Sequence, residues 1–240
     1  MAELVYPTII SLARVVFAAQ GLKFDLRGSA HVPRQGGAVM AINHVGYLDF
    51  TYAGYAAQPA HRLVRFMAKD QVFTHRISGP LMRGMRHIPV DRDAGTAAFR
   101  AATTALKNGE VVGVFPEATI SESFTVKELK SGAARLARTA KVPLIPMVVW
   151  GPHRLWTKGH QKDLKKRHVP VIIKVGEAIE MPKGTSPDVT TQTLHERLSK
   201  LLDAAQQAYP AKPSGPDDRW WLPAHLGGTA PLPEVAPAEA

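Results

Sequence analysis

Short apolar runs alternate with longer amphipathic segments along most of the chain. Five runs have the length and composition of buried strands, and they lie at residues 38–42, 63–68, 111–115, 142–149 and 171–175. Four segments carry apolar residues at helical spacing, and they lie at residues 48–57, 95–107, 128–140 and 190–209. Because strands that alternate with helices are typical of α/β folds, we predict a single domain over residues 22–209, with a mixed, mostly parallel sheet flanked by helices.

Three weaker signals complete the prediction for this domain. Phe24 and Leu26 alternate with polar residues as in a strand, and residues 71–81 have the pattern of a short, broken helical region. Residues 84–92 predict a turn followed by a short strand with a charged end.

The strand predicted at residues 142–149 contains two prolines, Pro143 and Pro146. Proline cannot donate a backbone hydrogen bond, so within sheets it is confined to edges, strand starts and bulges. We therefore expect this strand to begin at Pro143 and to deviate near Pro146.

The most apolar segment, residues 4–19, predicts an N-terminal helix that occupies residues 1–21 with its flanks. It is too short to cross a bilayer, which takes about 20 apolar residues, and Thr8, Ser11 and Arg14 form a polar stripe along one side. No positive charge precedes the run and no convincing cleavage site follows it, which argues against a secretory signal. The amphipathic helix either lies in the membrane interface or packs on the domain core.

From residue 210 to residue 240 the chain becomes rich in proline and low in complexity. We expect most of this tail to be extended or mobile. Trp220 and Trp221 are the exception, because two adjacent tryptophans seldom stay in water. They should pack on the domain or dip into the membrane interface as an anchor.

The composition narrows the range of partners. A chain of 240 residues with 45% hydrophobic content can bury a substantial core, and the absence of cysteine excludes disulfides. A formal net charge of +10 points to anionic partners, which are nucleic acids, phosphorylated small molecules or an anionic membrane surface. The sequence contains neither a phosphate-cradling glycine loop nor a nucleic-acid motif with aromatic residues set among basic ones. No nucleic-acid partner is therefore expected.

Positive charge is concentrated in two stretches. Residues 62–92 contain two acidic residues and seven basic ones. The basic residues are Arg62, Arg65, Lys69, Arg76, Arg83, Arg86 and Arg92. A second basic group lies in the predicted loop at residues 158–167. Either stretch could be a solvated face. The first could also line a phosphate site, and the second could meet lipid headgroups or the phosphates of a nucleotide-containing donor.

The most suggestive chemistry is a histidine and an aspartate, His44 and Asp49, between a predicted strand and a predicted helix. An aspartate just inside the helix can accept the imidazole N–H and leave the other ring nitrogen as a free base. The motif holds no serine or cysteine, so the hydroxyl to be activated would belong to a substrate. A structural His–Asp pair is the plain alternative, and two ligands without a cysteine are too few for a metal site.

Candidate residues follow four of the predicted strands. His44, Lys69, Arg92 and Glu117 each lie at the carboxyl end of a strand. In open α/β sheets, ligand-binding residues gather outside these ends. We expect the four side chains to share one rim of the sheet.

Four sequence blocks, taken in order, resemble those of the glycerolipid acyltransferases. They are His44-Val45-Gly46-Tyr47-Leu48-Asp49, residues 84–92, Phe115-Pro116-Glu117-Ala118-Thr119-Ile120-Ser121 and Val142-Pro143-Leu144-Ile145-Pro146. The resemblance covers roughly residues 38–150. Within that family the chain resembles the bacterial 1-acyl-sn-glycerol-3-phosphate acyltransferases.

The resemblance implies an enzyme of phospholipid synthesis. Such an enzyme moves a fatty acyl chain from acyl-CoA or acyl-carrier protein to the free hydroxyl of lysophosphatidic acid, and phosphatidic acid is the product. It would need no cofactor and no metal, and it would act as a peripheral or monotopic protein on the anionic cytoplasmic face of the cell membrane.

The resemblance also implies roles for particular residues. His44 would be the general base and Asp49 its orienting partner, while Arg92 would contact the acceptor phosphate and Glu117 would help to position the acceptor. The other substrate-binding candidates are Asn43, Lys69, Phe115, Pro116, Thr119 and Lys130.

The third block departs from the family pattern, which has glycine and arginine where this chain has Ala118 and Ile120. The family's arginine helps to bind the acceptor phosphate, and isoleucine cannot donate a hydrogen bond. Either Arg92 with Lys69 or Lys130 binds the phosphate, or the acceptor is another lysophospholipid or a phosphorylated glycolipid. An alternative of another class is a non-catalytic module that binds anionic lipid or nucleic acid.

Overall fold

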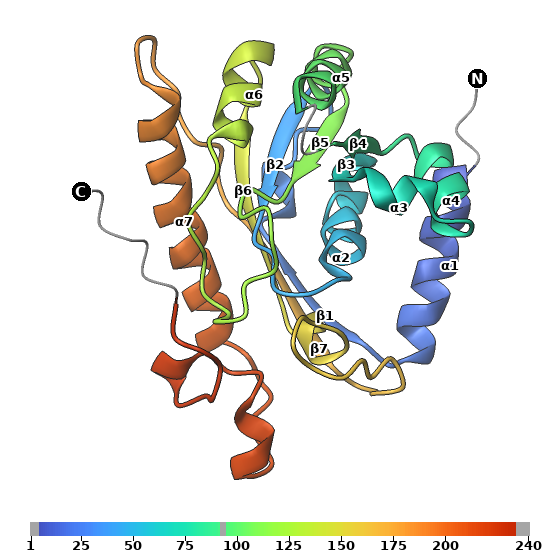
Figure 1. Ribbon diagram of the computed structural model, residues 1–240, viewed down its shortest axis with the longest axis vertical. Coiled ribbons are helices and arrows are strands. Elements are labelled where there is room, and N and C mark those ends of the chain that lie inside the picture. Colours follow the sequence, from blue (N-terminus) through green and yellow to red (C-terminus); the bar gives the residue numbers. More distant parts are fainter. Residues whose placement is uncertain (1–4, 92–94, 234–240) are drawn as a thin grey trace.

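The computed structural model describes residues 5–91 and 95–233, and these residues form a seven-stranded sheet covered by helices (Figure 1). The strands are β1 (Lys23–Arg27), β2 (Ala38–Ile42), β3 (Val64–Lys69), β4 (Ile88–Val90), β5 (Val111–Val114), β6 (Leu144–Trp150) and β7 (Pro170–Val175). The helices are α1 (Val5–Ala19), α2 (Asp49–Ala56), α3 (Asp70–Thr74), α4 (Ser78–Gly84), α5 (Gly95–Lys107), α6 (Gly132–Ala140) and α7 (Pro187–Gln207).

The sheet is mixed and mostly parallel, which confirms the predicted fold class. Its strand order is β1-β7-β6-β2-β5-β3-β4, and the pairs from β6 to β4 are all parallel. The pairing between β6 and β7 is antiparallel, so β1 and β7 run against the rest. The parallel strands β2, β5 and β3 are neighbours, and their carboxyl ends therefore lead to His44, Glu117 and Lys69 along one edge of the sheet.

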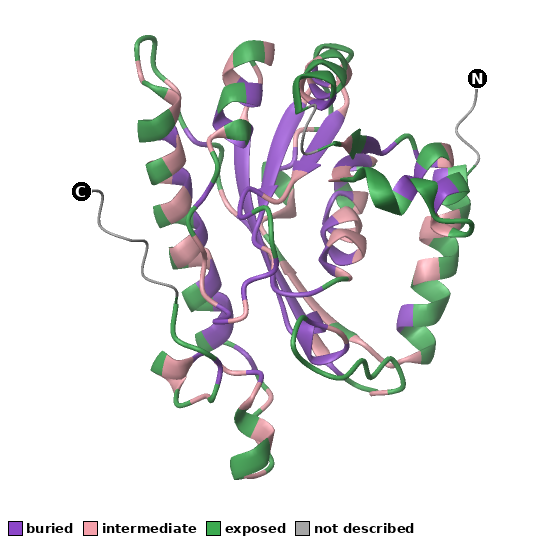
Figure 2. Cartoon of the chain, viewed as in Figure 1, coloured by how far each residue is buried: buried purple, intermediate pink, exposed green. Residues whose placement is uncertain are grey.

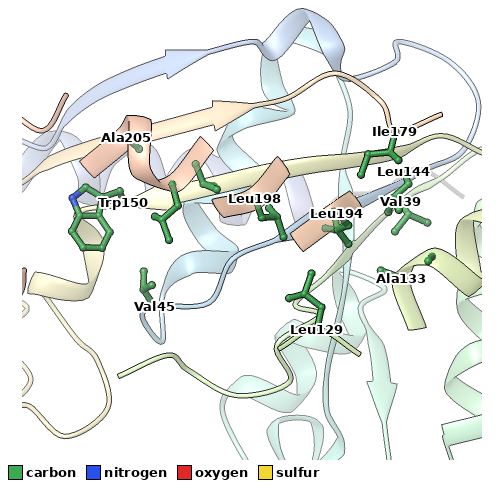
Figure 3. Close-up of a cluster of buried hydrophobic side chains, with 14 of the residues drawn as sticks. Val39, Val45, Leu129, Ala133, Leu144, Trp150, Ile179, Leu194, Leu198 and Ala205 are labelled. Carbon is green, nitrogen blue, oxygen red and sulfur yellow. The ribbon is translucent and has the colours of Figure 1, made fainter. Parts of the chain in front are cut away.

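Helices cover both faces of the sheet, because the side chains of each strand alternate between them. Val39 and Ala41 of β2 lie in a cluster with α5, α6 and α7, whereas Met40 and Ile42 lie in a cluster with α1 and α2. All residues of β2 are buried, as the purple strands in Figure 2 show. Burial on both faces explains why the strand is an unbroken apolar run in the sequence. Figure 3 shows the first cluster, in which Leu194 and Leu198 of α7 lie against the sheet.

Pro146 lies inside β6, near the middle of the sheet, and not at an edge. The Pro146 carbonyl accepts a hydrogen bond from the backbone N–H of Gly176 at 2.8 Å. Because the nitrogen and the carbonyl of a strand residue point to the same side, the Pro146 nitrogen, which carries no hydrogen, faces β7 and not β2. Pairing on that side changes from Leu144 with Ile179 to Met147 with Val175, which is a shift of one residue. The expected deviation near Pro146 is thus a bulge in the antiparallel pairing, where the missing donor costs no ladder bond.

Two helices, α6 and α7, begin three or more residues away from their predicted starts. α6 begins at Gly132 and not at residue 128, because residues 121–131 form a loop held by their own polar groups. In that loop the Ser121 hydroxyl donates to the Thr125 carbonyl at 2.7 Å. α7 begins earlier than predicted, at Pro187, because the Ser186 side chain accepts a hydrogen bond from the Val189 N–H and caps the helix.

α1 packs on the domain through one face and exposes another. The Tyr6 hydroxyl donates to the Val64 carbonyl at 2.7 Å, and the Phe17 ring stacks on Tyr52. Figure 2 shows mostly exposed positions along the rest of this helix. The two alternatives for the helix are therefore compatible, and contact with the membrane stays a prediction. Within residues 5–91 and 95–233, no helix combines the length and the apolar character that a bilayer crossing needs.

The C-terminal segment, residues 210–233, folds back onto the domain below α7 (Figure 1). Short 3₁₀ turns form at Pro216–Arg219 and Ala224–Leu226, so the expectation of a mostly extended tail is wrong for this part. Trp221 is fully buried in the cluster beneath α7, which confirms that it packs on the domain. Trp220 is half-buried and stacks on the His160 ring at a centroid distance of 4.2 Å.

Candidate active site

His44 lies on the turn that follows β2, and Asp49 is the first residue of α2. The His44 Nδ1 atom is 3.1 Å from the Asp49 Oδ2 atom, which also accepts the backbone N–H groups of Val45 and Gly46 at 2.8 Å each. A carboxylate can only accept, so Nδ1 carries the proton and Nε2 is left as an acceptor. The Asp49 side chain is fully buried while 22% of the His44 side chain is exposed. The pair can therefore act as a general base that a substrate can reach.

Gly46 is required by close packing against the segment that follows β6. A Cβ atom at this position would lie 3.0 Å from the Trp156 carbonyl oxygen, 3.2 Å from the His153 Cα atom and 3.3 Å from the Asp49 Oδ1 atom. A Cβ atom at position 46 would therefore require these neighbours to move by a few tenths of an ångström.

Two further hydrogen bonds fasten the same turn. The Thr157 hydroxyl donates to the Val45 carbonyl at 2.6 Å, and the Tyr47 N–H donates to the Trp156 carbonyl at 3.1 Å. Sequence reasoning missed Thr157 and Trp156, because they lie more than 100 positions away along the chain. The only local signal was the glycine at position 46, which is typical of close backbone approach.

Glu117 follows β5 and joins the third sequence block to the first. One carboxyl oxygen accepts the His44 N–H at 2.7 Å and the other accepts the Lys127 N–H at 3.0 Å. Burial raises the pKa of the Glu117 carboxyl to about 8, although the hydrogen bonds from the Lys127 and His44 backbones act in the opposite direction. Glu117 is 5% exposed, so its evident role is to hold the His44 turn, and direct contact with an acceptor stays a prediction.

The residues on either side of Glu117 have distinct structural roles. The Phe115 ring lies 4.4 Å from the His44 ring between centroids, and the buried Pro116 accepts the Lys130 N–H at its carbonyl. Ala118 has a φ of 59°, a left-handed conformation that disfavours residues with a Cβ atom. This backbone geometry explains why the family pattern has glycine at the position.

The remaining predicted site residues differ in how they are placed. Asn43 is fully buried, and its amide exchanges two hydrogen bonds with the Val149 backbone, so it extends the pairing of β2 with β6. Lys69 is exposed at the carboxyl end of β3, as predicted for the rim. Arg92 lies outside the described residues.

A large open cleft lies beside Glu117. Its volume is about 1280 Å³, and it is bounded by the loop at residues 117–131, by α7 and by residues 231–233. Thr119 and Lys130 are both exposed and line it. Ile120 also lines the cleft but is only 7% exposed. Two of the predicted substrate-binding residues thus face a space large enough for a lipid headgroup.

This arrangement agrees with the comparison to known proteins. A sequence model of the acyltransferase family matches residues 23–150, which include His44, Asp49 and Glu117. The chain belongs to the acyltransferase family. The match begins at β1 and ends with β6, so α7 and the C-terminal segment lie outside it.

Named relatives share most of this acyltransferase's length. The 1-acyl-sn-glycerol-3-phosphate acyltransferase of Bacillus subtilis is 28% identical over 203 residues, which are 80% of this chain and 98% of the relative. The enzyme of the same name from Streptococcus pneumoniae is 31% identical over 143 residues, 56% of this chain and 52% of the relative.

A solved structure has the same fold. The 1-acyl-sn-glycerophosphate acyltransferase of Thermotoga maritima superposes with a TM-score of 0.68 at 23% identity, and the match covers 86% of this chain and 81% of that one. The likeness extends the fold agreement beyond the residues that the family model covers.

Proposed function

We propose that this acyltransferase moves a fatty acyl chain from an acyl thioester to the free hydroxyl of lysophosphatidic acid, which yields phosphatidic acid. The observation that carries the proposal is the contact of His44 Nδ1 with the buried Asp49 carboxylate, which leaves Nε2 to act as a base. The relatives named 1-acyl-sn-glycerol-3-phosphate acyltransferase support lysophosphatidic acid as the acceptor.

In the proposed reaction, His44 is the group of the enzyme that exchanges a proton with the two substrates. His44 Nε2 takes the proton of the acceptor hydroxyl as its oxygen attacks the thioester carbonyl, because a neutral alcohol is a weak nucleophile. The tetrahedral intermediate then collapses, the new ester forms and the carbon–sulfur bond breaks. The departing thiolate receives the proton from the His44 imidazolium, so the enzyme returns to its starting state. Asp49 stabilises the positive charge on the ring meanwhile.

The acceptor phosphate requires a cation near the cleft. We propose that Lys130 and Lys69 supply it, with Arg92, because Lys130 lines the cleft and Lys69 is exposed at the same edge of the sheet. Ile120 offers no charge where the family pattern has arginine. This substitution favours a second candidate, the acylation of another lysophospholipid or a phosphorylated glycolipid.

We further propose that the enzyme binds an anionic membrane surface, at the cytoplasmic face of the cell membrane, through α1. Leu12, Val15 and Val16 on this helix are 59%, 66% and 44% exposed. The basic loop at residues 158–167 lies beside the end of α1, because the Gln20 side chain donates to the Leu164 carbonyl at 2.8 Å. Apolar side chains next to lysines suit an anionic lipid surface.

One assay tests the reaction and separates the candidates. Purified protein is given lysophosphatidic acid, a neutral-headgroup lysolipid or a phosphorylated glycolipid, each with acyl-CoA and with acyl-carrier protein as donor. We expect turnover with lysophosphatidic acid, and its loss by a factor of roughly 10² to 10⁴ in His44→Ala. The exposed His225 provides the control, since His225→Ala should keep the full rate. Undiminished turnover in His44→Ala would contradict the mechanism, and preference for another acceptor would favour the second candidate.

A further inference from the structure

The C-terminal segment makes a specific contact with the residues that follow β6. The Trp221 carbonyl oxygen is 2.9 Å from His153 Nε2, and the Arg154 guanidinium lies 4.1 Å from the centre of the Trp221 ring. The indole N–H of Trp221 is in turn bonded to Asp218. Trp221 therefore contacts two consecutive side chains of the domain. Its backbone carbonyl bonds to His153, and its ring lies against Arg154.

His153 is a neutral hydrogen-bond donor at this contact. A carbonyl oxygen can only accept, so the proton of the imidazole lies on Nε2. The His153 side chain is fully buried between the rings of Trp150 and Phe124, at centroid distances of 4.1 and 4.7 Å. Burial lowers the pKa of His153 to about 3, so the ring stays neutral under ordinary conditions.

The backbone of His153 packs against the turn that carries His44. The Cα atom of His153 lies 3.2 Å from the place where a Gly46 Cβ would be, and the next turn of chain supplies the Trp156 carbonyl and the Thr157 hydroxyl. Val45 belongs to the buried cluster that also contains Trp150 and Trp221, and Figure 3 labels Val45 and Trp150 among its members. A continuous line of contacts thus runs from the tail to the N–H groups that hold Asp49.

We propose that Trp221 and His153 are positioning residues of the active site, which act by fixing the turn that carries His44. This inference rests on the proposed function and goes beyond it, because the tail lies outside residues 23–150 that match the family. Displacement of a catalytic group by about 1 Å can lower a rate by roughly 10²-fold. Loss of the contact between Trp221 and His153 would therefore reduce turnover without removing any group that touches the substrate.

The decisive experiment compares two substitutions of His153 in the full-length protein. His153→Gln places an amide N–H where Nε2 donates, whereas His153→Leu fills a similar space without a donor. We expect His153→Gln to keep kcat within about threefold and His153→Leu to lower it roughly tenfold or more, with KM for both substrates unchanged within about twofold. Equal kcat values for the two variants would overturn the proposal.

A spectroscopic readout separates positioning from general destabilisation. The Nδ1 proton of His44 gives an imidazole resonance that is identified by its loss in His44→Ala. We expect this signal to move in His153→Leu and to stay in place in His153→Gln, at a temperature where both are folded. Because the signal is recorded without substrate, the inference can be decided even if lysophosphatidic acid proves not to be the acceptor. An unmoved signal in His153→Leu would count against positioning.

The role of the tail is tested by substituting its two adjacent tryptophans. This second test can still refute the proposal if a His153 variant fails to fold. Trp221→Leu should shift the His44 signal and lower kcat by at least fivefold. Trp220→Leu is the matched control, since the Trp220 ring stacks on His160, whereas His153 is hydrogen-bonded to Trp221. If the two tryptophan variants change kcat and the His44 signal equally, the tail only stabilises the fold and the proposal fails.

Discussion

A carboxyl oxygen of Glu117 accepts the backbone N–H of His44 at 2.7 Å, although the two residues are 73 positions apart in the chain. The parallel neighbours β2 and β5 end side by side, and this places the first residues after each strand within hydrogen-bond distance. One buried side chain therefore links the turn that carries His44 to the loop that borders the cleft.

Replacement of Glu117 should destabilise both loops. Glutamine can accept only one of the two N–H groups, so Glu117→Gln should lower the free energy of unfolding by about 1–3 kcal/mol near pH 6. Because the pKa of the carboxyl is raised from 4.5 in the unfolded chain to about 8 in the folded protein, the wild type loses stability as the pH rises between these two values, and the difference between the two proteins should be smaller above about pH 8 than near pH 6. Urea unfolding at the two pH values measures this.

The matched control for that experiment is Glu122→Gln. Glu122 is paired with Lys158 at 3.1 Å, but both side chains are about half exposed. An exposed pair contributes about 0–1 kcal/mol, so this variant should behave like the wild type. A Glu122 variant as unstable as the Glu117 variant would show that the buried hydrogen bonds are not the cause.

Ala118 offers a position where a substitution should stabilise the protein. Its φ of 59° is costly for alanine but open to glycine. We expect Ala118→Gly to raise the free energy of unfolding by up to about 1 kcal/mol. Ala101→Gly in α5 should lower it by about the same amount, because glycine is unfavourable inside a helix. Thermal unfolding of both variants checks the opposite signs, and a loss of stability in Ala118→Gly would contradict the strain.

Acid should destabilise the fold through His153. Its pKa is lowered by burial from 6.5 to about 3, so the unfolded chain takes up a proton below about pH 6.5 that the folded protein refuses. The stability supplied by the neutral ring is present above that pH and is lost as the pH falls. At about pH 4.5 the loss amounts to about 3 kcal/mol.

The comparison with His153→Gln isolates this contribution. Denaturant unfolding at about pH 7.5 and pH 4.5 should show a smaller loss in the variant, because glutamine does not titrate. The half-exposed His225 serves as the control, and His225→Gln should lose as much stability as the wild type. Equal losses in all three proteins would exclude His153 as the cause.

Membrane binding should depend on the exposed side of α1. Serine at positions 12, 15 and 16 removes three apolar side chains that are exposed and hold no part of the core. Each such side chain contributes about 1.5–3 kcal/mol when fully buried, so co-sedimentation with anionic vesicles should fall at least tenfold. Val189→Ser changes a similarly exposed residue on α7 and should leave binding intact. Unchanged binding of the triple variant would exclude α1 as the contact.

Much of the fold could be read from the sequence, because the relevant signals are local. β2 is buried on both faces and is therefore an unbroken apolar run, and the strand and helix that flank His44 and Asp49 follow from periodicity over a few residues. The His–Asp spacing across one turn leaves few geometries, so their contact was also predictable. The start of α6 was not, because hydroxyl contacts within residues 121–131 outweigh the helical pattern.

The sequence by itself determined the strands, the alternation with helices and the pair His44–Asp49, since each depends on neighbours along the chain. Only the tertiary structure decided that Glu117 bonds to the His44 turn, that Pro146 can lie inside a sheet and that His153 bonds to the Trp221 carbonyl. These contacts join residues from distant parts of the chain. Their partners are chosen by strand order and by how buried surfaces fit, and no local pattern records that choice.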